Sequence, residues 1–150
     1  MRWLSLLVLF AACSSEAPAA DRFTLVCESW FRASETVPPG IGQKLALPVN
    51  VPRWPVPEIG VPPKVTTAKH QDFIVKLSVV PGIAYLDILD AQTGKQIQRH
   101  LWQFSKVPVN NFGGTQQGFT GLNYVYHPVT KSELQFVCKV AKARGKGGAE

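Results

Sequence analysis

Three cysteines carry the clearest chemistry in this sequence of 150 residues. Cys27 and Cys138 each follow an apolar run that alternates like a strand, Phe-Thr-Leu-Val before the first and Leu-Gln-Phe-Val before the second. In an oxidising compartment such thiols form a disulfide, and two buried free thiols are the alternative. A Cys27–Cys138 bond would close a loop of about 110 residues, which the chain-entropy model values at roughly 4 to 5 kcal/mol. We expect it to join the first and last strands of one domain.

No other pattern of side chains predicts catalysis. The histidines His70, His100 and His127 have no second His, Cys or Glu at the spacing that binds zinc. No Gly-x-Ser-x-Gly turn is present to carry a nucleophile. Asp87 and Asp90 lie three apart in an expected strand, which places them on opposite faces and argues against an acid/base pair. The sequence therefore predicts a protein that is not an enzyme and that uses no metal or small-molecule cofactor.

A binding surface is the remaining chemistry, and the proline-rich segment 37–63 offers one. It contains eight prolines, and within it Arg53 and Trp54 stand side by side. An arginine and an aromatic ring on a stiff segment lose little conformational entropy when they dock, so the pair is a candidate anchor for a protein partner. The alternative is that Trp54 covers the core while the prolines hold the loop in place. Because proline lacks the N–H that a sheet ladder needs, the segment should form an extended loop or an edge strand, and alternation favours a short edge strand over 45–51.

The elements that must position these residues are strands. Runs with strand-like patterns cover 23–32, 73–80, 83–90, 95–104, 122–126 and 133–140, and no run has the 3.6-residue period of an amphipathic helix. Six strands at short spacing predict an all-β fold over residues 21–141. We expect a single antiparallel β-sandwich of immunoglobulin-like architecture with a long proline-rich loop. The stretch 110–118, rich in glycine and amides, should be a mobile loop.

Residues 1–20 have the three parts of an export signal: Arg2, the apolar run 3–12, and then small residues. The apolar run is too short to span a bilayer, which takes roughly 20 residues. Two cleavage sites fit the sequence. The small residues at 17–20 suit an ordinary signal peptidase, which would discard Cys13 and leave a soluble protein.

The second cleavage site is Phe10-Ala11-Ala12-Cys13, which resembles the lipobox of bacterial exported lipoproteins. Leu is usual in that family where Phe10 stands. The resemblance implies that Cys13 becomes the lipidated first residue of the mature chain, followed by a short tether up to residue 20. Ser14 after the cysteine implies sorting to the outer membrane. We therefore expect an exported, periplasmic protein that a lipid on Cys13 holds at the outer membrane.

The net charge of +6 is unevenly spread, because Lys139, Lys142, Arg144 and Lys146 all fall within the last twelve residues. Residues 142–150 should form a basic disordered tail, which either touches anionic lipid or is a solvated end with no role. Nucleic acid is not an expected partner, because no aromatic stacking motif accompanies the charge.

Together these patterns predict a non-enzymatic bacterial cell-envelope lipoprotein with an accessory or structural role. It would bind another envelope protein through the proline-rich segment or through a sheet edge. The alternative is a periplasmic inhibitor or immunity protein that blocks a toxin or hydrolase.

Overall fold

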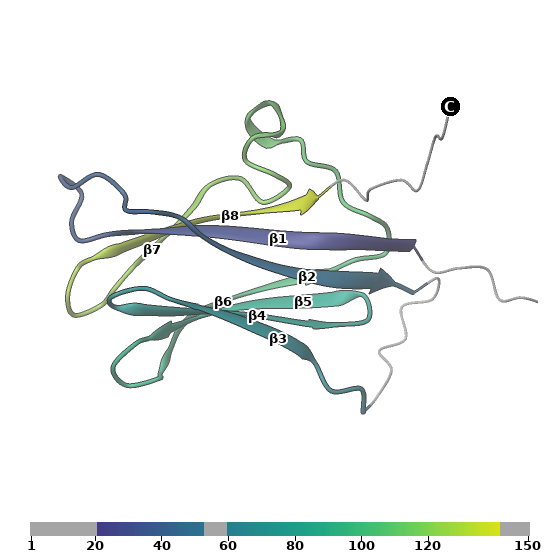
Figure 1. Cartoon of the computed structure of the whole chain (residues 1–150), viewed down its shortest axis with the longest axis horizontal. Helices are drawn as coiled ribbons and strands as arrows, with labels where there is room; N and C mark the ends of the chain where they lie inside the picture. The colour runs from purple at the N-terminus through teal and green to yellow at the C-terminus, as the bar shows by residue number, and fades with distance from the viewer. Residues whose placement is uncertain (1–20, 53–59, 142–150) are drawn as a thin grey trace, which may run out of the picture.

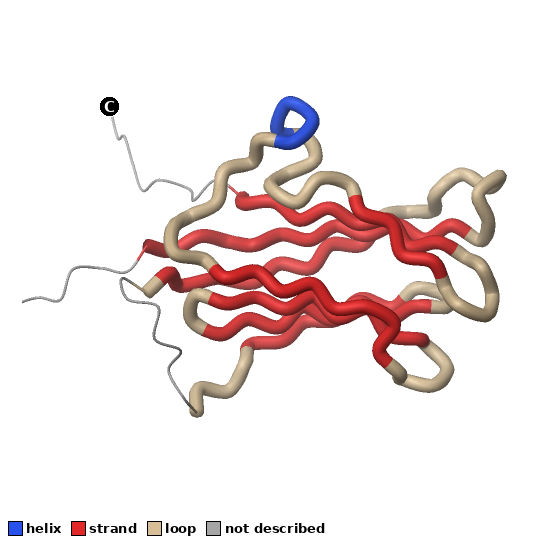
Figure 2. The backbone as a smooth tube through the Cα atoms, turned by 180° about the vertical axis from the view of Figure 1, so that it is seen from behind, coloured by secondary structure: helices blue, strands red, loops and turns tan. Residues whose placement is uncertain are grey.

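The computed structural model describes residues 21–52 and 60–141. These residues form two four-stranded antiparallel sheets that lie one above the other, as both views show (Figures 1 and 2). The prediction of an all-β antiparallel sandwich is confirmed. The strands are β1 (Asp21–Arg32), β2 (Gln43–Val51), β3 (Lys64–Lys69), β4 (Phe73–Val80), β5 (Ile83–Asp90), β6 (Gln96–Gln103), β7 (Asn123–Tyr126) and β8 (Glu133–Ala141), and a 3-10 turn, η1 (Phe112–Thr115), lies between β6 and β7.

The strand order follows the chain around the sandwich. Sheet A has the order β2-β1-β8-β7, and sheet B has the order β3-β4-β5-β6. The chain crosses between the sheets after β2 and after β6, so the first and last strands end up as neighbours in sheet A. The two layers are those of an immunoglobulin-like architecture, but immunoglobulin domains connect their strands in a Greek-key order and place their disulfide between the sheets.

The predicted disulfide joins the first and last strands. Cys27 of β1 and Cys138 of β8 are direct cross-strand partners, and their sulfur atoms are 2.05 Å apart. Both residues are buried, with exposed fractions of 2% and 0%. The bond therefore lies within sheet A, between the first and last described strands, which are neighbours there.

Alternation explains which side chains fill the core between the sheets. Every second residue of β4 from Phe73 to Val79 is buried, and so is every second residue of β1 from Phe23 to Ser29. Leu134, Phe136 and Cys138 of β8 also point inward, as the sequence predicts. Together with Leu86 and Ile88 of β5, these residues make one apolar core that holds the sheets together.

The structure has two strands, β2 and β3, in addition to the six that a clear sequence pattern predicts. The edge strand proposed for 45–51 exists as β2, and Pro48 lies in it at the edge of sheet A. Strand β3 was not predicted, because only Ala68 of its six residues is buried and lysines occupy both of its ends. Pairing with the strongly apolar β4, rather than a hydrophobic pattern of its own, makes it a strand.

Candidate functional site

The residues singled out from the sequence fall into two groups. Cys27 and Cys138 form the buried disulfide and serve the fold. Cys13, Arg53 and Trp54 lie outside the described residues, so the lipidation site and the partner anchor stay predictions. No helix within 21–52 and 60–141 is long and apolar enough to cross a membrane.

His127 and its neighbours form the first polar cluster with the residue types of a catalytic site. The imidazole Nδ1 accepts hydrogen bonds from the backbone N–H groups of Val129 and Thr130, at 3.3 and 3.1 Å. The proton must therefore sit on Nε2, which lies 3.5 Å from Asp90 Oδ2. Backbone N–H groups of Thr93 and Gln92 lower the pKa of Asp90. Both ring nitrogens of His127 therefore face partners within the fold, and neither is open to a substrate.

The side chain of Ser132 lies near this histidine but makes no hydrogen bond to the imidazole, although His127 N donates to Ser132 O at 2.8 Å. Ser132 Oγ donates to Asp72 Oδ2 at 2.6 Å, and Thr130 Oγ1 donates to the same oxygen at 2.8 Å. Asp72 precedes β4 of sheet B, whereas Ser132 precedes β8 of sheet A. The cluster therefore ties the turns of the two sheets together at one end of the sandwich.

A second pair, Ser29 and His70, is a direct serine–histidine contact. Ser29 Oγ lies 2.9 Å from His70 Nε2, and burial lowers the pKa of His70, which favours the neutral form of its imidazole. With an exposed fraction of 2%, the Ser29 side chain is out of reach of a substrate. The pair links β1 of sheet A to the turn before β4. Within the described ranges, no three His, Cys, Asp or Glu side chains are placed to hold a metal ion.

The edges of the sheets offer a different kind of site, because an uncovered edge presents backbone groups that can pair with another chain. Two four-stranded sheets have four edges in the described chain: β2 and β7 in sheet A, and β3 and β6 in sheet B. Native proteins cover such edges with proline, lysine, short strands or loops. The four edges differ in how they are covered.

The edges of β2 and β3 face each other, and a hydrogen bond at each end of β2 joins it to sheet B, one to β3 and one to the turn between β4 and β5. Asn50 O of β2 accepts a hydrogen bond from Gly82 N at 2.8 Å, and Gln43 Nε2 donates to Lys69 O of β3 at 2.7 Å. Pro48 removes a donor from β2, and lysines end β3.

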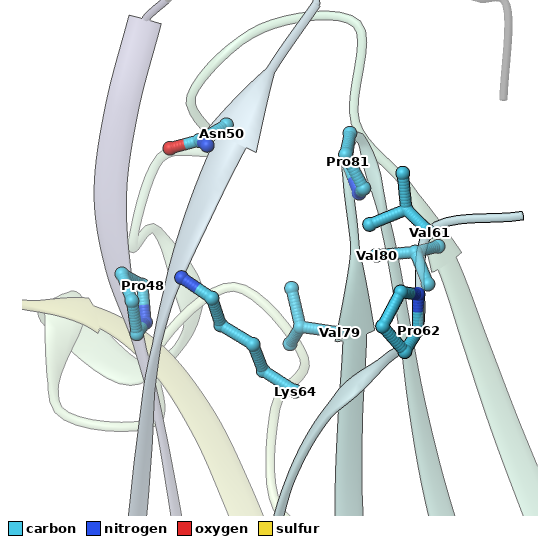
Figure 3. Close-up of a pocket in the computed structure, with 8 residues that line it drawn as sticks. All are labelled: Pro48, Asn50, Val61, Pro62, Lys64, Val79, Val80 and Pro81. Carbon is cyan, nitrogen blue, oxygen red and sulfur yellow. The ribbon is translucent and has the colours of Figure 1, made fainter. Parts of the chain in front are cut away.

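Where β2 and β3 diverge, a cavity of about 180 Å³ remains, and Lys64 extends from β3 toward β2 beside it (Figure 3). Its lining is Pro48, Asn50, Val61, Pro62, Lys64, Val79, Val80 and Pro81. Among the described residues, Asn50 and Lys64 alone bring polar side chains to this cavity, so the described lining offers little for recognition.

On the β7 side of sheet A, the long connection from β6 covers the part of β8 that β7 does not reach. β7 is four residues long, and beyond it the side chain of Asn110 replaces a strand, bonding the N–H and C=O of Val140 at 2.9 and 2.8 Å. Thr120 Oγ1 accepts from Cys138 N at 2.9 Å. The chain passes so close to β8 at Gly118 that a Cβ there would collide with the Cys138 carbonyl, and its φ of +65° also suits glycine.

The edge of β6 is different. Phe104 N donates to Gly82 O. Because backbone N–H groups alternate in direction along a strand, this bond shows which N–H groups of β6 point toward β5 and which point away from it. The N–H groups of Trp102 and His100 must then point toward β5, and those of Arg99, Leu101 and Gln103 point to the free edge. No hydrogen bond in the described residues reaches β6 from that side. The strand is eight residues long, contains no proline, and has Arg99 as its one formal charge at neutral pH.

Side chains on both faces of β6 could contact a chain that pairs with it. On the outer face Leu101 is 56% exposed, and Arg99 beside it makes a two-point ion pair with the buried Asp87, at 2.5 and 3.0 Å. On the inner face Trp102 packs edge-on against Phe119, with ring centroids 5.8 Å apart. A cavity of about 380 Å³ opens beside the C-terminal half of the strand, lined in part by Leu101, Trp102 and Phe119.

The β6 edge is therefore the candidate site. The sequence predicted this strand and proposed a sheet edge as a binding surface, but it held no signal of which edge is free. Which edge is free depends on contacts between distant segments, such as the hydrogen bonds by which Asn110 covers β8, 30 residues away in the sequence.

Comparison with known proteins gives no relative from which a function could be transferred. No family model matches the chain, and neither a curated protein nor a solved structure matches it.

Proposed function

We propose that this chain is a non-enzymatic bacterial cell-envelope protein with an accessory or structural role, and that it binds another envelope protein by pairing β6 with an extended segment of that partner. The supporting observation is the difference between the edges. Proline, lysine and cross-sheet hydrogen bonds cover β2 and β3, β7 is only four residues long, and loop side chains cover β8 beyond it, whereas the backbone groups on the free side of β6 have no partner in the described chain. Adding a strand to such an edge is a common mode of peptide recognition.

The partner segment would gain affinity from the backbone and specificity from side chains. Backbone groups of Arg99, Leu101 and Gln103 point to the free edge and supply the hydrogen bonds. Because side chains alternate along a strand, the partner's residues would lie in turn beside Leu101 on the outer face and beside Trp102 on the inner face. The cavity that Leu101, Trp102 and Phe119 help to line would receive an apolar side chain of the partner.

Leu101→Pro tests this pairing. The substitution removes an N–H that points to the free edge, so the ladder with β5 should survive while the partner's strand loses a donor and meets the proline ring. We expect binding to weaken about tenfold or more, which is about 1.4 kcal/mol. A photo-crosslinking residue at the exposed position Gln103 would report the partner, and the crosslinked yield would report binding.

The matched control is Leu101→Thr, which shortens the side chain but keeps the backbone N–H. It should retain most of the crosslinking, and both variants should unfold at similar temperatures. Equal crosslinking by the proline and threonine variants would contradict pairing through the backbone.

One observation favours the alternative role of an inhibitor or immunity protein. The connection that contains η1 projects from the sandwich (Figure 2), and Phe112 in it is 49% exposed. An aromatic side chain on a projecting loop could enter the active site of a toxin or hydrolase. In that case Phe112→Ala would abolish binding, and Leu101→Pro would leave it unchanged.

Export and anchoring belong to the same proposal and rest on the sequence of residues 1–20. Cys13→Ser should release the protein from the membrane fraction, because the modified cysteine would be its only lipid anchor. Labelling with a radioactive fatty acid and fractionation of cells would measure this. A mature N-terminus at Ala20 or Asp21 would instead show that the protein is exported without lipid.

A further inference from the structure

Two rows of side chains cross the outer face of sheet A. This face is separate from the β6 edge, which belongs to sheet B. Register places Trp30 of β1, Gln135 of β8 and Tyr124 of β7 directly side by side in the first row. The second row lies two residues further along each strand and consists of Arg32, Glu133 and Tyr126. These positions alternate with the core residues Leu134 and Phe136, so all six side chains lie on the face turned away from the core.

Glu133 is unusual for a residue on the outer face of a sheet, because its side chain is only 3% exposed. Gln135 Nε2 donates to its Oε1 at 2.6 Å, and Arg32 Nε lies 3.6 Å from the same oxygen. A hydrogen bond to this carboxylate raises the pKa of Tyr126. Burying a carboxylate is costly unless several donors satisfy it. Here the donors are also the side chains that line the surface, so Glu133 holds them in fixed positions.

A cavity of about 220 Å³ lies in the first row. Trp30, Pro39, Leu122 and Gln135 line it. The indole of Trp30 lies against Gly42, where any Cβ would collide with it, and this contact fixes the ring. The amide nitrogen of Gln135 is committed to Glu133, and its Oε1 has no hydrogen-bond partner within the described residues.

Aromatic rings flank this free acceptor on both sides. Trp30 and Tyr124 stand two strand spacings apart, which is roughly 9 to 10 Å, with Gln135 between them. Tyr124 is 49% exposed and Tyr126 is 51% exposed. The surface thus places flat aromatic rings beside an amide, a guanidinium and a phenol hydroxyl within these two rows.

We propose that this face binds a glycan, with one pyranose ring in the cavity and a neighbouring ring on Tyr124. A pyranose ring has apolar C–H faces, which stack on aromatic rings, and hydroxyl groups around its rim. One hydroxyl donates to Gln135 Oε1, and another accepts from Arg32 Nη1, the guanidinium nitrogen that does not contact Ser34 O, Glu35 O or Glu133. The cavity is smaller than the roughly 300 to 1,000 Å³ of sites for drug-sized ligands, so it suits a single ring. A protein contact would instead favour a continuous apolar centre with polar groups at its rim.

Titration calorimetry of the full chain with chitotetraose and with cellotetraose tests this site. We expect at least one of the two sugars to bind. Tyr124→Ala should weaken the binding about tenfold, because it removes an exposed ring and no hydrogen bond of the fold. Phe112→Ala is the matched control, since it removes a ring of similar exposure from a different surface and should bind the sugar as the unchanged protein does.

Three outcomes would overturn the proposal: no binding of either sugar, equal binding by the Tyr124→Ala variant, or loss of a crosslinked protein partner from that variant without any sugar binding. The last outcome would assign the face to a protein. Leu101→Pro separates this site from the β6 edge, because it should lower partner crosslinking and leave sugar binding unchanged.

Discussion

Replacing Cys27 and Cys138 together by alanine should lower the free energy of unfolding by roughly 4 to 5 kcal/mol. The bond spans 111 residues of sequence, so breaking it frees nearly the whole described domain in the unfolded state. It also joins the two strands that close sheet A, which no turn connects. A domain of this size is commonly stable by 5 to 15 kcal/mol, so the double variant should be marginal at body temperature.

Urea titration followed by tryptophan fluorescence would measure this loss. The wild-type protein unfolded in the presence of a thiol reductant is the control, because it loses the cross-link but keeps both sulfur atoms. Its unfolding midpoint should fall close to that of the alanine variant. If the oxidised protein and the double variant unfold at the same urea concentration, the disulfide does not stabilise the fold.

Phe73→Ala should cost about 3 to 5 kcal/mol. Phe73 begins β4 in sheet B and is fully buried. Its ring lies edge-on to Phe31 of sheet A, with centroids 6.3 Å apart, and to His127, at 5.5 Å. Removing it leaves a cavity between the sheets at the end where Asp72 and Ser132 hold the turns together.

Phe112→Ala is the matched control for this change, since the same atoms are removed from an exposed position and the cost should stay within about 0.5 kcal/mol. Thermal unfolding of the two variants would compare them directly. Similar melting temperatures for both would mean that Phe73 is not part of the packed core.

Much of the fold follows from local sequence. Alternation of apolar residues predicts β1, β4, β5 and β8, because each of these strands presents one face to the core. It fails for β3, whose sequence Lys-Val-Thr-Thr-Ala-Lys has almost no apolar face and depends on its neighbour. The disulfide was predictable because both cysteines lie on inward positions of strong strands.

The candidate sites were much less predictable, because they depend on register and on distant segments. Glu133 lies on the outer face of sheet A, but nothing local in the sequence indicates that Arg32, Tyr126 and Gln135 enclose it. The freedom of β6 depends on Asn110 and Thr120 covering β8 instead. Such arrangements arise only when all strands are placed.

The order of the strands has a consequence for how the gene could be rearranged. Strands that are neighbours around the sandwich are neighbours in the chain, and the first and last described strands run side by side, with Thr24 opposite Ala141. A linker from residue 141 to residue 21 would therefore be short, and new ends could be opened at a turn such as that between β5 and β6. Every strand would keep its neighbours, so the fold is suited to circular permutation. The Cys27–Cys138 bond would still link β1 and β8, now near the new linker.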